Sequence, residues 1–507
     1  MNATPANARN GRLWSEHAER TFTIAAGVAC TSSLFYLLAA NDLRMTSVSG
    51  IWTALAVDFH HGVLYRPIES DLGYGGSRYF PLHFMLQGLL MRWTRPLPAG
   101  HLIAAASATL MAAAVFQLLR RSRVPVRLAL ASLGLLFVGD TVMHAVTEIK
   151  GDLLPLTLAL WALVVIESMP GLILGPSLAG VLLGLAVVAK PTSIMYAAAI
   201  CIYLLSFRRR LATAVVASFV IVFAGSMLVA IDAESAHSFA LNMSEFGNAG
   251  AGISRLAKNC LPNFIHQAYG FADPALIVFL SAAVPAAPLL WRSGKPLLFW
   301  VFAAVLVGTI IIMGSPGTTR NHLIDLYVCS LLVVISTLGH VRLRLRTLGL
   351  VSATAAAIAG SIALVLHPLV GNARQTANSR REIISLLERE GAYEYANRVL
   401  CFDPLIDIEA KQSPYLLDSM MFGVYLKRHP DFATRFVEKL RAGTFSFIVL
   451  TIPYGATGQV NPRAVASQVG LDGARALAER YDLILRSGMY VVYERRLRMG
   501  PPQQFNW

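Results

Sequence analysis

Long apolar runs, separated by short polar breaks, recur along the first three quarters of the chain. An α-helix needs about 20 apolar residues to cross the hydrocarbon core of a bilayer, which is about 30 Å thick. The runs predict eleven membrane-spanning helices, at residues 21–40, 100–119, 128–146, 152–167, 171–189, 191–207, 211–231, 274–291, 296–313, 323–340 and 347–369. We therefore expect an all-α polytopic membrane domain at residues 21–369, after a cytoplasmic segment at residues 1–20.

Three stretches depart from this pattern. Residues 41–99 and 232–273 are too polar and too long to be simple connections, so we expect two outer loops. In the first loop, residues 47–59 and 82–93 mix apolar and polar positions at helical spacing, which predicts helices along the membrane surface.

The third stretch, residues 370–507, returns to the composition of a soluble domain. Its pattern predicts helices at residues 380–390 and 461–481, and strands at residues 399–402, 445–452, 483–485 and 489–493. We expect a small C-terminal extracytoplasmic α/β domain.

Composition and charge support a membrane protein. Of the 507 residues, 55% are hydrophobic and 14% charged, which excludes a soluble enzyme and a disordered chain. The formal net charge is +14, but the arginines cluster in alternate loops, around residues 9–20, 120–127, 208–210 and 342–346. This is the positive-inside pattern of a multi-pass membrane protein. We expect the protein in a bacterial cytoplasmic (inner) membrane. It predicts the N-terminus inside and the C-terminal domain outside, and no nucleic-acid partner.

The five cysteines show no framework spacing. Three lie in apolar runs and are expected to pack there: Cys30, Cys201 and Cys329. Cys260 and Cys401 lie in or near outer segments, where a disulfide between them is an open alternative.

Ionisable side chains at the membrane are costly, so each is a functional candidate. On the outer side they gather at span ends and in the first loop: Asp42, Asp58, Glu69, Asp71, Glu148, Lys150, Asp152, Lys190, Arg320 and Asp325. Among charged residues, only Asp140 lies well inside a span. This distribution favours chemistry at the outer interface over transport through the midplane.

Two smaller patterns leave alternatives open. Asp140, His144 and Glu148 are four residues apart and form one helical stripe, either a wet cavity wall or groups that hydrogen-bond within the bundle. His60 and His61 follow Asp58, but adjacent imidazoles point apart and no third ligand has zinc-like spacing, so we expect no metal site.

Several segments resemble the GT-C superfamily, the membrane glycosyltransferases that use polyprenyl-phosphate sugars. Asn41-Asp42, Gly62-Val63-Leu64-Tyr65 and Arg78-Tyr79-Phe80-Pro81-Leu82 are similar to the family's first outer loop. Three later segments resemble further family motifs: Lys150-Gly151-Asp152, Ala189-Lys190-Pro191 and Arg320-Asn321-His322-Leu323-Ile324-Asp325. The similarity covers about residues 20–340, and several branches also carry an outer C-terminal domain.

The resemblance implies transfer of a sugar, with inversion, from a polyprenyl-phosphate donor to a glycan, lipid or protein acceptor. Asp42 is then the catalytic base, and Asp152 the second catalytic carboxylate, orienting Lys150, a sugar hydroxyl or a metal. The implied substrate-binding residues are Arg78, Tyr79, Lys190, Arg320, Asn321 and Asp325. Lys190, Arg320 and Arg78 could hold the lipid phosphate, or simply reach the headgroups. No cofactor is expected, although a divalent cation stays open.

Two departures leave the branch of the family open. Asp42 stands alone where protein O-mannosyltransferases and aminoarabinose lipid A transferases have an Asp-Glu pair, and His322 replaces the usual Tyr. Asp58, one interfacial helix later, is expected to be merely solvated. The alternative function is a transporter or flippase of a lipid-linked substrate, although no broken helices recur in two halves.

Overall fold

The computed structural model describes residues 5–40, 45–169, 172–230, 233–246, 253–270, 273–315, 318, 320–338, 343–366, 369–393, 399–452 and 460–496. They belong to two compact units. The first contains residues 1–41, 101–229 and 250–367, and the second residues 42–100, 230–249 and 368–507. The second unit thus gathers the first predicted outer loop, part of the second loop and the C-terminal segment.

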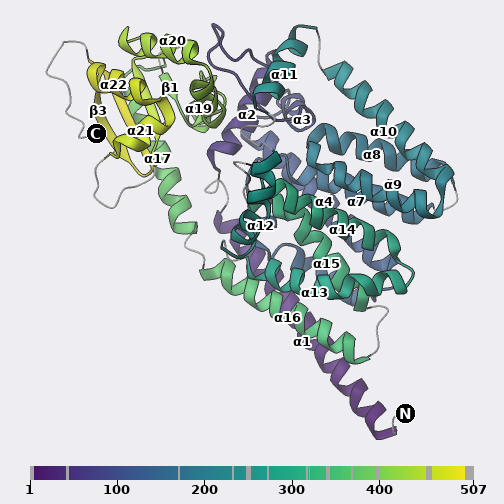
Figure 1. Cartoon of the computed structure of the whole chain (residues 1–507). Coiled ribbons are helices and arrows are strands. Elements are labelled where there is room, and N and C mark those ends of the chain that lie inside the picture. Colours follow the sequence, from purple (N-terminus) through teal and green to yellow (C-terminus); the bar gives the residue numbers. More distant parts are fainter. Residues whose placement is uncertain are drawn as a thin grey trace. The chain divides into compact units, whose positions relative to one another are not determined.

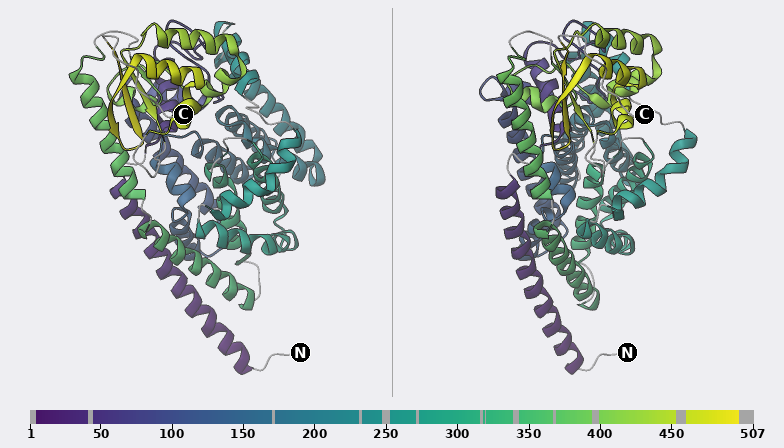
Figure 2. Two further views of the ribbon diagram at one scale, coloured as in Figure 1. Left: turned by 60° about the vertical axis from the view of Figure 1, so that its left-hand side comes forward. Right: turned by 90° about the vertical axis from the view of Figure 1, so that its left-hand side faces the viewer.

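The first unit is built of helices (Figure 1). They are α1 (Pro5–Ala40), most of α4 (Pro96–Arg121), α5 (Val126–Leu136), α6 (Asp140–Thr147), α7 (Leu153–Ser168), α8 (Leu174–Ala189), α9 (Ile194–Phe207), α10 (Arg209–Ala230), α12 (Ile253–Gly270), α13 (Pro274–Arg292), α14 (Pro296–Met313), α15 (Ile324–Leu338) and α16 (Leu343–Leu366). Short 3-10 turns precede two of them, η1 (Pro191–Ser193) and η2 (Arg320–Leu323). Helices α1 and α16 lie side by side (Figure 2).

The helices of this unit include segments long and apolar enough to cross a membrane. Within the described ranges these are α4, α10, α13, α14 and residues 321–338, with the bent pair α5 and α6 as a sixth candidate. Shorter apolar helices are α7, α8, α9 with its preceding turn, and part of α16. The protein is therefore a multi-pass helical membrane protein, and the count of eleven spans stays a prediction.

The predicted span at residues 128–146 is two helices, α5 and α6, bent by 70°. Asp273 stabilises the bend, because its Oδ2 accepts from the backbone N of Thr141 at 3.1 Å and from the Thr141 hydroxyl at 2.8 Å. Its Oδ1 accepts from the backbone N of Leu276 at 3.1 Å, so one carboxylate caps both α6 and α13. A carboxylate at a helix N-terminus satisfies N–H groups that have no partner within the helix. This cap lies 132 residues away from the bend in sequence and is not visible in the apolar pattern.

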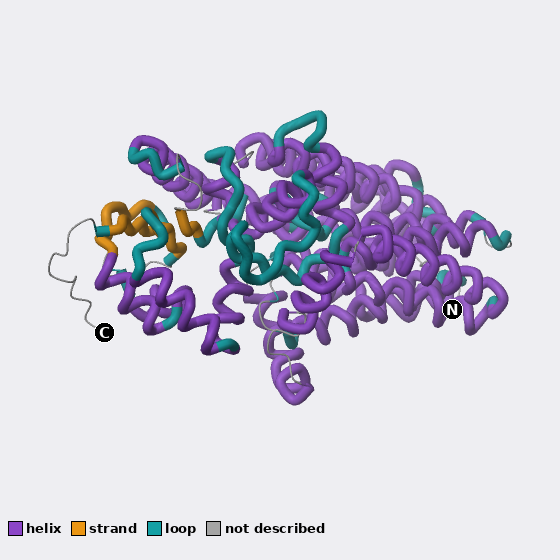
Figure 3. The backbone as a smooth tube through the Cα atoms, turned by 90° about the horizontal axis from the view of Figure 1, so that it is seen from above, coloured by secondary structure: helices purple, strands orange, loops and turns teal. Residues whose placement is uncertain are grey.

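The second unit combines helices with a four-stranded sheet (Figure 3). Its helices are α2 (Ser47–His60), α3 (Leu82–Leu90), α11 (Ala233–Phe246), α17 (Leu369–Arg389), α18 (Pro404–Glu409), α19 (Ser419–Arg428), α20 (Pro430–Arg441), α21 (Pro462–Val469) and α22 (Leu471–Arg480). The strands are β1 (Val399–Cys401), β2 (Phe447–Thr451), β3 (Tyr481–Ser487) and β4 (Tyr490–Arg495), in the order β1-β2-β4-β3. Strands β1 and β2 are parallel, and the other pairs are antiparallel.

The sheet is covered on both faces because β1, β2 and β4 are apolar at consecutive positions. Ile448 and Leu450 of β2 pack in one core with residues of α19, α20, α21 and α22. Phe447 and Val449 point to the opposite face and pack with Ile383 and neighbouring residues of α17. This alternation follows from the two-residue period of a strand. The four predicted strands are confirmed, with ends shifted by a few residues.

Other parts of the second unit correct the sequence predictions. The single helix predicted at residues 461–481 is two helices, since Gly470 has a φ of 77° and ends the first of them. The predicted loop at residues 232–273 contains α11 in the second unit and α12 in the first unit. The predicted helices at residues 47–59 and 82–93 are present as α2 and α3. Helix α2 packs closely on α18, because a Cβ at Gly50 would lie 2.5 Å from the backbone N of Leu405.

All five cysteines are free thiols in the structure. Cys401 is buried in β1.

Candidate active site

Asp152, Lys190 and Asn321, from three separate segments of the first unit, meet in one polar cluster, here called the Asp152 cluster. The Nζ atom of Lys190 lies 2.5 Å from Oδ1 of Asp152. The side-chain amide of Asn321 donates to both carboxylate oxygens, at 3.2 and 3.1 Å. Sequence analysis singled out all three residues, and the structure brings them together.

Local structure explains why Lys190 is available at this position. Asp152 stands directly before α7, and Lys190 follows the end of α8, a helix that packs against α7. Pro191 disfavours the helical conformation for the residue before it, and Lys190 is extended, with φ −155° and ψ 116°. The lysine side chain therefore leaves the helix axis and reaches the start of α7.

Further polar residues surround the cluster. Lys150 and His322 lie near enough to interact electrostatically with Asp152, and Lys190 likewise with Asp325. The hydroxyl of Tyr196 donates to Oδ1 of Asp325 at 2.9 Å. Sequence analysis missed Tyr196, because a tyrosine within an apolar run looks like a packing residue. Its position six residues after Lys190 was the only signal.

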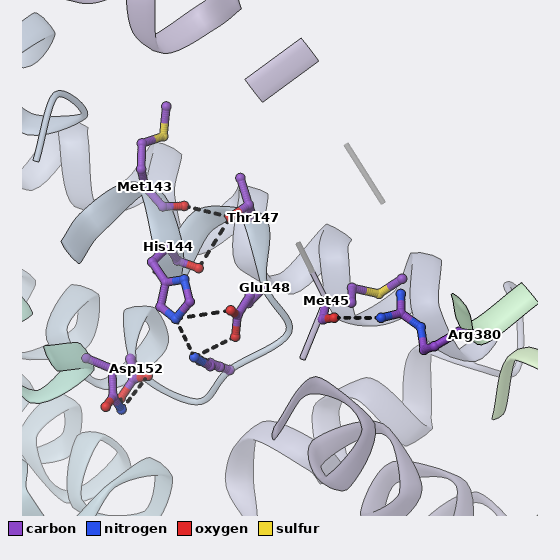
Figure 4. A network of polar contacts seen from close by, with 9 residues as sticks. Met45, Met143, His144, Thr147, Glu148, Asp152 and Arg380 are labelled. Atoms are coloured by element: carbon purple, nitrogen blue, oxygen red, sulfur yellow. Dashed lines mark hydrogen bonds and ion pairs between the residues drawn. The ribbon is translucent and has the colours of Figure 1, made fainter. Parts of the chain in front are cut away.

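A second network lies between the end of α6 and the start of α7 (Figure 4). Nε2 of His144 lies 3.0 Å from Oε1 of Glu148, and Nζ of Lys150 lies 2.5 Å from Oε2 of the same carboxylate. Nζ of Lys150 also lies 2.9 Å from Nε2 of His144. This polar stripe was expected either to line a wet cavity or to hydrogen-bond within the bundle. His144 and Glu148 make their contacts within the bundle. Lys150 pairs with Glu148, while the ion-pair partner of Asp152 is Lys190.

Two predicted site residues cannot be placed in the same way. Asp42 and the side chain of Arg320 lie outside the described part of the chain, although the backbone of Arg320 begins η2. Arg78 and Tyr79 belong to the second unit. There the Tyr79 ring packs on Trp52 at 4.4 Å between centroids, and Arg78 interacts electrostatically with Asp418.

Asp58 corrects a prediction, because it is buried and not solvated. Only 6% of the residue is exposed, and its Oδ1 lies 2.6 Å from Nη2 of Arg66. Nη1 of Arg66 also donates to the backbone carbonyls of Leu72 and Pro414, at 3.0 and 2.8 Å. The prediction failed because these partners fold over Asp58 from a loop and from the C-terminal segment.

Among the residues that the structure describes, no group of three or more His, Cys, Asp or Glu is arranged to hold a metal ion. His60 has a structural contact instead, since its Nδ1 lies 3.1 Å from the backbone oxygen of Gly88.

The Asp152 cluster can bind an anion beside a fixed carboxylate. An ammonium group carries three donors, and Asp152 accepts one of them. The Lys190 side chain is 15% exposed, whereas that of Asp152 is 6% exposed, so the cation is the more accessible partner. Because Asn321 and Lys190 occupy its oxygens, the carboxylate orients the cation.

No family model and no curated protein matches this sequence. Solved structures do match. ArnT from Cupriavidus metallidurans in the apo state has a TM-score of 0.60 at 13% identity, over 95% of this chain and 98% of that chain. ArnT bound to undecaprenyl phosphate gives 0.55 at 12% identity, over 95% and 99%. The oligosaccharyltransferase of Archaeoglobus fulgidus in the apo form gives 0.53 at 12% identity, over 95% and 74%. At 12–13% identity, these matches show that the chain shares its fold with these proteins.

Proposed function

We propose that this protein is an integral-membrane glycosyltransferase that moves a sugar from a polyprenyl-phosphate donor to a glycan, lipid or protein acceptor. The observation that carries the proposal is the Asp152 cluster, a fixed carboxylate with an accessible lysine in the helical first unit. It is supported by the fold, which matches a protein crystallised with undecaprenyl phosphate over 95% of this chain.

The reaction is a single displacement at the anomeric carbon of the donor. The acceptor hydroxyl oxygen attacks this carbon, and the bond from the carbon to the phosphate oxygen breaks. The electron pair of that bond leaves with the polyprenyl phosphate, and the hydroxyl proton passes to a base. The sugar carbon is inverted. Charge develops on the leaving phosphate, so fixed cations stabilise the transition state.

We assign Lys190 to the phosphate of the donor. Its ammonium is held by Asp152, and Asn321 fixes the carboxylate from the other side. A cation held in place before the reaction needs little reorganisation when charge develops. Arg320, at the start of the turn that carries Asn321, and Arg78 are further candidates for the same phosphate.

We assign the role of general base to Asp42. A carboxylate at the end of the first span is reached both by an aqueous acceptor and by a donor whose chain lies in lipid. Asp152 is less suited to this role, since Lys190 and Asn321 already occupy its oxygens.

The arginine distribution supports an orientation with the N-terminus in the cytoplasm and residues 370–507 on the outer face of a bacterial inner membrane. Single-cysteine variants near Gln412 and Ser122 test it in intact cells. A membrane-impermeant reagent is expected to label the first position and not the second.

The direct test is transfer by the purified protein in detergent, with a panel of polyprenyl-phosphate sugars as donors. Cells lacking the protein are expected to accumulate one lipid-linked sugar, which selects the donor. Formation of a glycosylated product in detergent, where no compartments exist, supports an enzyme. If the accumulated lipid is never consumed in detergent but moves across vesicles that contain the protein, the flippase alternative replaces this proposal.

A further inference from the structure

A cavity of about 160 Å³ lies in the first unit, at the end of the helices opposite to the Asp152 cluster. Helix α7 starts beside Asp152 and ends at the cavity, where Glu167 and Met169 line it. Helix α9 begins just after Lys190 and ends at the cavity with Tyr203 and Arg208. Sixteen residues of α7 span about 24 Å, close to the thickness of a bilayer core. The cavity and the cluster therefore belong to opposite membrane faces.

The charged groups of the cavity give it a net positive character. Arg208 and Lys295 line it, with Glu167 as the carboxylate among the lining residues. Nζ of Lys295 lies 3.2 Å from Oε2 of Glu167, and these side chains are 19% and 11% exposed. Nη1 of Arg121 contacts the backbone oxygen of Glu167 at 3.5 Å, which brings a further guanidinium to this end of α7.

Aromatic side chains mark this end of the helices as the level of the headgroups. The ring of Phe207 lies 5.3 Å from Tyr203 and 5.9 Å from Trp291 between centroids. Trp291 lies 6.0 Å from Trp300, and it is 44% exposed. Trp and Tyr are enriched where a membrane protein crosses the headgroup layer. This observation is independent of the charges and points to the same place.

We propose that this cavity binds the headgroup phosphate of an anionic phospholipid, in the leaflet opposite to the Asp152 cluster. The size leaves room for a phosphate group, and Arg208 and Lys295 supply charge-assisted donors. The lining also includes the apolar residues Leu204 and Leu211. Basic pockets between membrane helices are a known setting for acidic headgroups. The proposal does not depend on the glycosyltransferase reaction.

The test is lipid binding to the full-length protein in detergent, measured by native mass spectrometry with phosphatidylglycerol and phosphatidylcholine. Wild-type protein is expected to retain phosphatidylglycerol preferentially. Arg208→Gln and Lys295→Gln should each weaken its binding by about 5- to 30-fold, as expected for the loss of a charge-assisted hydrogen bond. Arg209→Gln is the matched control, because Arg209 is exposed next to Arg208 but does not line the cavity.

Glu167→Gln gives a prediction of opposite sign. It removes the cavity's carboxylate, so binding of phosphatidylglycerol should become tighter, whereas a purely structural role would weaken it or leave it unchanged. Melting temperatures close to that of wild type show that the variants are folded.

Three outcomes overturn the proposal. One is an equal loss in the Arg208 and Arg209 variants, which means general attraction to a basic surface. Another is equal retention of the two lipids by wild type. The third is that millimolar inorganic phosphate stabilises wild type but not the Arg208 variant, and displaces the lipid, which assigns the cavity to free phosphate.

Discussion

Two carboxylate–cation pairs, one in each unit of the protein, differ in how far their side chains are exposed to solvent. In the second unit, Asp58 and Arg66 have side chains 7% and 2% exposed, and the guanidinium also donates to two backbone carbonyls. In the first unit, the Asp152 carboxylate is similarly buried, but Lys190 is 15% exposed and has Asp152 as its ion-pair partner. The Arg66 pair is shielded from solvent, and Nη1 and Nη2 of its guanidinium are bonded to acceptors of the protein, so this pair fixes the first loop. The Lys190 pair leaves donors for a ligand. Burial of an ion pair therefore does not by itself identify a ligand site, whereas a fixed and accessible cation does.

The largest effect is expected from Asp42→Asn. This variant tests whether the general base is Asp42, which belongs to neither of the two ion pairs. The substitution keeps the shape and removes the base, so transfer should fall by about 10²- to 10⁴-fold, the usual range for a general base. The measurement is kcat/KM for transfer by purified protein, with donor binding measured in parallel. Asp71→Asn, an exposed carboxylate in the same loop, is the control and should retain most activity. Equal losses in both variants would remove Asp42 from the mechanism.

The next effect concerns the buried pair of Asp58 and Arg66. Arg66→Met leaves the buried Asp58 without its cation and two carbonyls without their donor, so it should destabilise the protein by about 3–5 kcal/mol. Thermal unfolding in detergent measures this. The control is Arg435→Met, which removes an exposed contact to Glu69 and should leave the melting temperature nearly unchanged. If an Arg66 variant melts like wild type but no longer binds the donor, the Asp58–Arg66 pair is a ligand site and not a structural one.

The smallest effect is a pH dependence in the C-terminal segment, where Asp407 is a buried carboxylate. Burial raises the pKa of Asp407 well above its usual range, the charge of Asp403 adds to this, and a hydrogen bond from the Tyr393 hydroxyl opposes it. The unfolded carboxyl ionises near its ordinary pKa of about 4, so the folded state loses stability as pH rises from there through its own higher pKa.

Asp407→Asn keeps the acceptor for Tyr393 and cannot ionise. Its melting temperature should exceed that of wild type at neutral pH, and the difference should shrink as the pH approaches 4. A difference that stays constant between these pH values would show that ionisation of Asp407 does not contribute.

The sequence predicted the parts of the fold that depend on local pattern. Strands β1 to β4 and helices α2 and α3 follow from the spacing of apolar residues over a few positions. Asp152 and Lys190 were found as ionisable residues at the ends of predicted spans, whereas Asn321 was implied only by the resemblance to a known family. The resemblance to a known family then placed them on one face.

The predictions that failed concern parts of the structure that depend on contacts between residues far apart in the chain. The bend between α5 and α6 relies on Asp273, and the burial of Asp58 relies on Pro414 as well as Arg66. Tyr196 reaches Asp325 from a helix whose pattern is otherwise apolar. Arg66 lies only eight residues after Asp58, but its own contact with Pro414, like the contacts of Asp273 with Thr141 and of Tyr196 with Asp325, joins residues more than 100 positions apart, where no periodicity can reveal it.

The proposed function depends most directly on the binding of polyprenyl phosphate to Lys190. The measurement is the dissociation constant of polyprenyl phosphate for wild type and Lys190→Gln in detergent, with melting temperatures to show that both are folded. Loss of a charge-assisted hydrogen bond to an anion is worth about 1–3 kcal/mol, so binding should weaken by about 5- to 150-fold. Lys190→Arg, which keeps the charge, should recover part of the loss. An unchanged dissociation constant in a folded Lys190→Gln variant would contradict the assignment of Lys190 to the donor phosphate.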